Sequence, residues 1–120
     1  MKYVLTHVKK PITTNAERAG NRWARAAHTK EWRQVFALLA RKEKIPAMKW
    51  INVTAQPFQK MGRLQDTAAC NPSVKAAIDG LVDAGVLPDD SGEYVRMIIF
   101  MPPLRGADKL TLTIEGERNA

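Results

Sequence analysis

The chain has 120 residues, of which 45% are hydrophobic and 26% charged, a composition typical of one compact folded domain and not of a disordered or fibrous chain. The only cysteine is Cys70, and the two histidines are His7 and His28, which excludes an internal disulfide and a zinc site built from cysteine and histidine. No apolar run is long enough to cross a membrane, and no signal-peptide core follows Met1. We therefore expect one soluble domain over residues 1–120 in a reducing compartment.

The net charge of +7 is distributed unevenly along the chain. Residues 1–65 carry 14 lysines and arginines against three glutamates, whereas residues 66–120 carry five basic and nine acidic residues, including all six aspartates. A basic surface gains affinity for nucleic acid through counterion release, and clustered aspartates supply the hard oxygen ligands that Mg²⁺ prefers. Together, these two features suggest phosphodiester chemistry. On the charges alone, two solvated faces of a basic protein are an equally good explanation.

Hydropathy patterns predict two helices and four strands in the order β-α-β-α-β-β. Apolar residues recur every three or four positions in the helices, and they alternate or run continuously in the strands. In chain order, we expect a strand over residues 3–8, a helix over 29–44, a strand over 50–55, a helix over 72–84, and strands over 95–101 and 110–115. This order predicts a single α+β domain in which two main helices pack on one mixed sheet.

The segment before the first predicted helix is polar and basic. Residues 13–27 predict a loop with a helical turn, and Thr29 is expected to cap the helix that follows. Trp23 lies in this predicted loop, and core packing is favoured for it over a role as a wedge in nucleic acid. Core packing is favoured in the same way for Trp32 and Trp50.

A proline, a glycine and one apolar run predict where the later elements end and how they pack and connect. Pro57 is expected to end the second strand, and Gly85 to end the second helix. Residues 95–101 are almost continuously apolar, which predicts a strand covered on both faces, in part by a second subunit. This strand is expected to form a hairpin with the last strand through the loop around Gly106.

The carboxylates of the second half lie before, within and after the second predicted helix. A helix of about 13 residues spans roughly 20 Å, so its two ends share a site only if a loop runs back along it or a second subunit contributes. Gathered carboxylates would hold one or two Mg²⁺ ions, and a lysine would balance the charge of the scissile phosphate. The residues are Asp66 before the helix, Lys75, Asp79 and Asp83 within it, and Asp89 and Asp90 after it.

A simpler interpretation exists for each of these acids. Lys75, Asp79 and Asp83 follow one another at intervals of four residues and can form ordinary pairs along one helix face. Asp89 and Asp90 are common turn formers. No one of these signals is specific by itself.

Asp66 and the segment NPSVKAAIDGLVDAGVLPDD at residues 71–90 together resemble the RusA family of Holliday-junction resolvases, particularly its bacteriophage members. The shared features are an upstream aspartate, a helix that opens near a lysine, an aspartate four residues later, an Asp-Ala-Gly step and a closing Asp-Asp pair. Weaker similarity extends over most of the chain. The sequence departs from the best-known motif at Ala68 and Ala69, where that motif has a second aspartate followed by asparagine.

The resemblance implies a homodimeric endonuclease of recombination and repair, in the cytoplasm of a bacterial host and encoded by a phage or prophage. Such an enzyme binds four-way DNA junctions and resolves them by paired nicks that depend on Mg²⁺, with Mn²⁺ as an alternative ion. The matching positions imply that Asp66, Lys75 and Asp90 are catalytic, and that Asp66, Asp79, Asp89 and Asp90 bind metal.

The basic residues of the first half predict a DNA surface that contacts phosphates without reading sequence. Because Ala68 and Ala69 replace a carboxylate and its neighbour, a DNA-binding or partner-binding protein that no longer cuts is the alternative hypothesis. A small RNA-binding domain is a third, less favoured hypothesis, since no strand carries an obvious aromatic stacking pair. The candidate DNA-binding residues are Lys9, Lys10, Arg18, Arg22, Arg25, Lys30, Arg33, Lys60 and Arg63.

Overall fold

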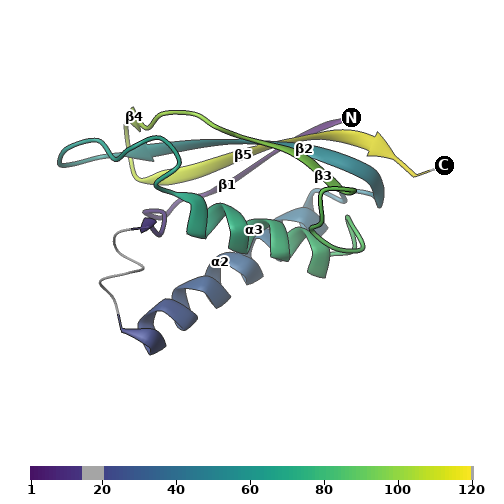
Figure 1. The fold of residues 1–120 in the computed structure, drawn as a ribbon, viewed down its shortest axis with the longest axis horizontal. Coiled ribbons are helices and arrows are strands. Elements are labelled where there is room, and N and C mark those ends of the chain that lie inside the picture. Colours follow the sequence, from purple (N-terminus) through teal and green to yellow (C-terminus); the bar gives the residue numbers. More distant parts are fainter. Residues whose placement is uncertain (15–20, 120) are drawn as a thin grey trace.

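The structure, a computed structural model, describes residues 1–14 and 21–119 and has an α+β fold, as predicted (Figure 1). Two helices and a mixed sheet make up the fold. In chain order the elements are β1 (Lys2–His7), α2 (Arg22–Lys42), β2 (Met48–Gln59), α3 (Asn71–Asp83), β3 (Val95–Phe100), β4 (Leu104–Arg105) and β5 (Lys109–Arg118). Among the described helices, none combines the length and the hydrophobicity needed to cross a membrane.

The sheet has the strand order β1-β5-β2-β3, with the short β4 also paired to β2. β5 runs antiparallel to both β1 and β2, whereas β3 and β4 run parallel to β2. The predicted hairpin between β3 and β5 is therefore wrong. β5 pairs with β2 along almost its whole length, from Arg118 opposite Met48 to Lys109 opposite Phe58, and this long ladder places it in the centre of the sheet.

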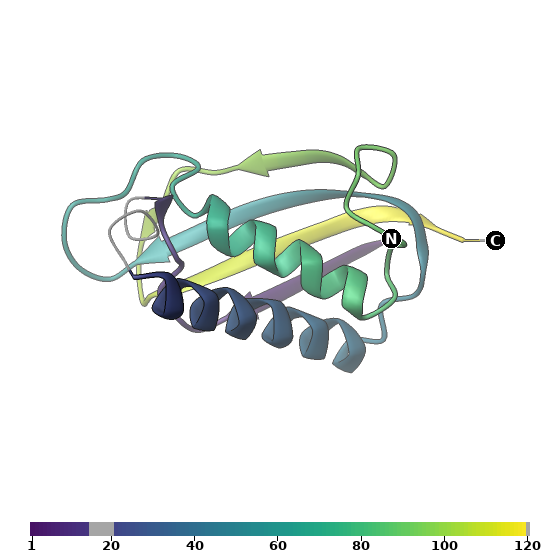
Figure 2. The same cartoon turned by 60° about the horizontal axis from the view of Figure 1, so that its bottom comes forward.

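Both helices lie on one face of the sheet (Figures 1 and 2). The strands bury alternate residues on that face, as the period of two requires, and leave the residues between them half-exposed on the open face. The core therefore lies between one sheet face and the apolar faces of α2 and α3. Its largest fully buried side chains include Trp32, Phe36, Ile51, Ile78, Leu81, Leu110, Leu112 and Ile114.

Helix α2 begins seven residues earlier than the predicted cap at Thr29. The side chain of Asn21 caps it, because its Oδ1 accepts a hydrogen bond from the backbone N–H of Ala24 at 2.8 Å. Residues 22–27, predicted as loop, are therefore helical, and they lack an apolar stripe because this end of the helix extends past the core. Trp23 is 78% exposed, so its predicted core packing is wrong.

The other two tryptophans differ from each other. Trp32 is buried in the core, as predicted, and stacks on Phe36 with ring centroids 5.9 Å apart. Trp50 is only half-buried, because it lies on the open face of the sheet, where its Nε1 donates a hydrogen bond to Glu117. The prediction of core packing is thus confirmed for Trp32 alone.

Strand β2 continues two residues past Pro57, which was expected to end it. β3 pairs with β2 only as far as Phe100, opposite Ala55, and β4 takes over at Leu104, opposite Phe58. Pro57 lies at the break between these two ladders, where proline is tolerated in a sheet. The expected end of α3 is confirmed, because Gly85 has a φ of +83° that favours glycine.

Within the described chain, strand β3 is an edge strand that is not covered on both faces, so the rest of the expected cover would have to come from a second subunit. Its first residue, Val95, is buried, but Met97, Ile98 and Ile99 are exposed. The helices cover only one face of the sheet, and no described strand pairs with the outer edge of β3. The apolar run therefore forms an exposed strip along one edge of the described chain.

The backbones of the two helices lie close together at Gly80 of α3. A Cβ atom at this position would lie 2.3 Å from the backbone oxygen of Arg33 and 3.0 Å from the backbone nitrogen of Ala37, both in α2. Glycine is therefore required here for helix packing, although it normally weakens a helix relative to alanine.

We predict that Gly80→Ala lowers the free energy of unfolding by about 1–3 kcal/mol, because the added methyl group forces α2 and α3 apart. In an unconstrained helix the same change would stabilise the protein by roughly 0.5–1 kcal/mol. Urea denaturation of the variant measures the difference. Gly92→Ala is the control, since no atom lies within 4 Å of its added Cβ; a Gly80→Ala variant as stable as the wild type would contradict the packing described.

Candidate metal and nucleic-acid site

Lys75 lies between two carboxylates that come from different parts of the chain. Asp79 is one helical turn further along α3, and its Oδ1 lies 3.3 Å from the Lys75 Nζ. The same Nζ donates a hydrogen bond to Oδ2 of Asp90, in the loop between α3 and β3. This loop therefore folds back along α3, as a shared site requires. We call these three residues the Lys75 cluster.

Within the Lys75 cluster, Lys75 and Asp90 stabilise each other's charged forms. The hydrogen bond from Lys75 is the main cause that holds the pKa of Asp90 below its ordinary value. The same hydrogen bond raises the pKa of Lys75. Both groups are therefore charged at neutral pH. The pair is lost when the pH falls through the lowered pKa of Asp90 or rises through the raised pKa of Lys75. Because these side chains are largely exposed to solvent, the pairing contributes little to stability but keeps the carboxylate ionised.

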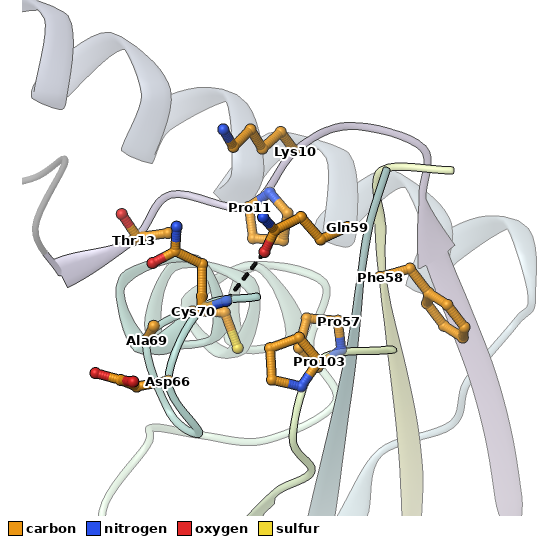
Figure 3. Close-up of a pocket in the computed structure, with 11 residues that line it drawn as sticks. Lys10, Pro11, Thr13, Pro57, Phe58, Gln59, Asp66, Ala69, Cys70 and Pro103 are labelled. Carbon is orange, nitrogen blue, oxygen red and sulfur yellow. Dashed lines mark hydrogen bonds between the residues drawn. The ribbon is translucent and has the colours of Figure 1, made fainter. Parts of the chain in front are cut away.

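Two further predicted acids lie outside the Lys75 cluster. Asp66 is in the loop between β2 and α3, where its backbone oxygen accepts a hydrogen bond from Ala69 at 3.0 Å and its carboxylate is turned outward (Figure 3). Asp89 accepts a hydrogen bond at 2.7 Å from the backbone N–H of Ser91, so it acts as the turn former of the simpler interpretation. Within residues 1–14 and 21–119, no three His, Cys, Asp or Glu side chains lie close enough together to hold a metal ion.

The donor set of the Lys75 cluster nevertheless suits Mg²⁺. Asp79 and Asp90 each direct an oxygen at one cationic centre, the Lys75 ammonium. Mg²⁺ is commonly held by one or two carboxylates, with water and substrate phosphate completing its coordination. Two converging carboxylates are thus sufficient for a site that is completed by substrate.

Gln59 organises the loop that carries Asp66, and no sequence signal pointed to this residue. It is buried at the end of β2, where its Nε2 donates hydrogen bonds to the backbone oxygens of Met61 and Arg63 at 2.6 and 2.7 Å. Its Oε1 accepts one from the backbone N–H of Gln65 at 3.1 Å. The residue was missed because Pro57 was expected to end the strand, which would have left Gln59 in a solvated loop.

A small apolar pocket lies behind this loop (Figure 3). Pro57, Pro103 and Cys70 line it, and Asp66 is at its rim. Burial raises the pKa of the Cys70 thiol to about 11. The thiol is therefore protonated at neutral pH and acts as an apolar packing group rather than a nucleophile.

Two of the predicted DNA-binding cations are paired within the protein. Lys9 donates hydrogen bonds to both carboxylate oxygens of Glu31 at 2.7 Å. Arg33 forms a bidentate pair with Asp83, at 2.6 and 2.8 Å, which lowers the pKa of that carboxyl group. Asp83 thus pairs with α2, and the simpler interpretation that paired it with Lys75 is wrong.

The remaining basic residues form two groups. Arg22, Arg25 and Lys30 line an open groove on α2 together with Arg33. Lys60 and Arg63 are in the loop between β2 and α3, and Lys10 lines the pocket beside that loop. Within the described part of the chain, the six cations other than Arg33 make no ion pair. Arg18, also predicted to bind DNA, lies outside the described residues.

No family model and no curated protein matches this chain. The function must therefore be inferred from the Lys75 cluster, the unpaired basic residues of α2 and of the loop before α3, and the motif that carries the resemblance.

We predict that Cys70, the single thiol of the chain, reacts with a disulfide reagent at pH 8 at least about 100-fold more slowly in the folded protein than in urea. Its raised pKa and its burial both reduce the amount of accessible thiolate. Absorbance after addition of the reagent measures the rate. Equal rates in the folded and unfolded protein would show that the thiol is accessible and the pocket is open.

Proposed function

We propose that the protein is a RusA-like, Mg²⁺-dependent endonuclease that binds four-way DNA junctions and resolves them by paired nicks. The observation that carries this proposal is the Lys75 cluster, in which a lysine and two carboxylates from separate segments meet at one point. These residues stand at positions of the motif that resembles the RusA family. Unpaired cations on α2 and on the loop before α3 supply a surface for phosphates.

Each residue of the Lys75 cluster has a distinct role in this proposal. Asp79 and Asp90 would hold Mg²⁺, which when bound supplies an activated water and stabilises the leaving oxygen. The Lys75 ammonium has three N–H donors, of which two are directed at the carboxylates. The third can donate to an oxygen of the scissile phosphate and balance its charge. Asp66, in the loop before α3, and Asp89, which accepts a hydrogen bond from Ser91, lie outside the Lys75 cluster and are not metal ligands in this proposal.

The second candidate function is junction binding without cleavage. Ala68 and Ala69 supply no carboxylate where the best-known motif has one, and the described residues contain no group of three metal-ligating side chains. Phosphate contacts by the basic residues would not need the missing ligand. Binding could therefore persist on this scaffold even if the metal site were too weak to support hydrolysis.

We predict that the wild-type protein nicks a synthetic four-way junction symmetrically in Mg²⁺, with Mn²⁺ tested in parallel, and that Asp90→Asn cuts roughly 100-fold more slowly or worse. Junction affinity should be retained, because the change does not remove a phosphate-binding cation. Gel assays of nicking and binding measure both quantities.

Glu93→Gln is the matched control, because it removes one exposed carboxylate from the same loop without touching the Lys75 cluster. Tight junction binding by the wild type without nicks in either metal would instead establish the second candidate. A protein that prefers single-stranded RNA to junctions would contradict both candidates and favour the third hypothesis.

The proposed enzyme is a homodimer, because two strands related by a two-fold axis are cut naturally by two identical sites. The exposed edge of β3 is the surface that best suits this contact. Met97, Ile98 and Ile99 are exposed along it, and the described chain provides no strand to pair with its outer side. Antiparallel pairing of β3 with its copy would give hydrogen-bond partners to the backbone groups of both edges and would cover the apolar strip.

We predict that Ile99→Lys weakens the homodimer by at least about 10-fold, since a charged side chain on an edge strand opposes pairing. Light scattering over a range of concentrations measures the dissociation constant. Leu38→Lys places the same charge at an exposed apolar position of α2 and should leave the dimer unchanged. A dimer unaffected by Ile99→Lys would place the contact elsewhere.

A further inference from the structure

We propose that Trp23 stacks on an unpaired base at the branch point of the DNA, while Arg22, Arg25 and Lys30 hold the adjacent phosphates. This inference rests on the junction binding of the proposed function, but it concerns a contact away from the Lys75 cluster. It assigns a binding role to the first turns of α2.

Nothing in the described part of the chain explains the exposure of Trp23. It is 78% exposed, whereas Trp32 is in the core and Trp50 is held by Glu117 and by the Arg96 guanidinium, 4.7 Å from its ring centre. Among the described residues, only Arg22 has a ring contact with Trp23, at 5.7 Å from its centre. Burial of a large apolar side chain normally stabilises a fold, and the described fold forgoes most of that stabilisation here.

The charges around Trp23 are also unfavourable for the helix alone. A helix N-terminus carries a partial positive charge and is normally accompanied by acidic residues. The first turn of α2 has none, and it carries Arg22 and Arg25 instead. The positive charges at this end of α2 repel one another in the free protein, and together they attract an anion. Asn21 caps the helix, so the turn that presents Trp23 is already formed before any ligand binds.

The groove that Arg22 helps to line extends the same charge along α2. Arg25, Lys30 and Arg33 line it, and its one carboxylate, Asp83, is already bonded to Arg33. A row of cations beside one exposed aromatic ring matches a phosphate backbone with an unstacked base. A membrane surface would need a continuous apolar face, and this end of α2 has only the single tryptophan.

The start of α2 is positioned so that it can form one DNA surface together with the loop between β2 and α3. In both views, the start of α2 lies at the same end of the molecule as the loop between β2 and α3 (Figures 1 and 2). That loop carries Lys60 and Arg63. A branched DNA that contacts the loop can therefore present its branch point toward Trp23, where base pairs are most easily unstacked.

The test measures binding of the full chain to a four-way junction with 2-aminopurine at the branch point, and to a duplex carrying the same reporter. The titration is done without divalent metal, so that cleavage does not contribute. Trp23→Ala should weaken junction binding roughly 5- to 150-fold, the range for one base stacked on an aromatic side chain. Duplex binding should change less than about 2-fold, and the fluorescence change of the reporter should disappear.

Two further variants separate stacking from general effects. Trp23→Phe keeps an aromatic ring and should recover most of the affinity, whereas Leu38→Ala removes another exposed apolar side chain of α2 and should have no effect. Unchanged junction binding by Trp23→Ala, or an equal loss for junction and duplex, would overturn the inference while leaving the nuclease proposal intact. A change in oligomeric state with Trp23→Ala would overturn it in favour of a protein contact. A wild-type protein with no preference for junctions would overturn the proposed function together with this inference.

Discussion

The contact of the Lys75 ammonium with Asp79 and Asp90 is the interaction on which the functional account depends. It links the second turn of α3 to the loop that follows the helix, and so brings a carboxylate of the helix and a carboxylate of the loop to one point. Packing makes this possible. Gly80 allows α3 to lie against α2, and the buried face of α3 orients Lys75 and Asp79 away from the core. The site is therefore a product of helix packing together with one returning loop.

Local patterns predicted the elements well, and long-range pairing limited the prediction. The period of the apolar residues placed both helices and every long strand, because each depends on residues close in sequence. The position of β5 between β1 and β2 depends on residues far apart, and adjacency in the chain wrongly favoured a hairpin with β3. The exposure of β3 was also not visible, since a continuous apolar run is equally typical of a buried strand and of an edge that awaits a partner.

The part of the candidate site that depends on the spacing of residues within one helix was predictable. Lys75 and Asp79 are four residues apart in a helix, and their contact is the direct consequence. The return of Asp90 to the same lysine required a particular loop path, which the sequence allowed but did not determine. The pairing of Asp83 with Arg33 and the role of Gln59 could not be predicted, because both depend on how separate segments pack.

In the proposed function, the carboxylates of α3 and of the loop that follows it bind a divalent ion. Paramagnetic broadening of backbone NMR signals by substoichiometric Mn²⁺, with junction DNA present, locates that ion directly. Broadening should be strongest at residues around Asp79 and Asp90, and it should be lost in a variant with both Asp79→Asn and Asp90→Asn. Broadening centred on another part of the protein, or none that depends on these two carboxylates, would contradict the proposal.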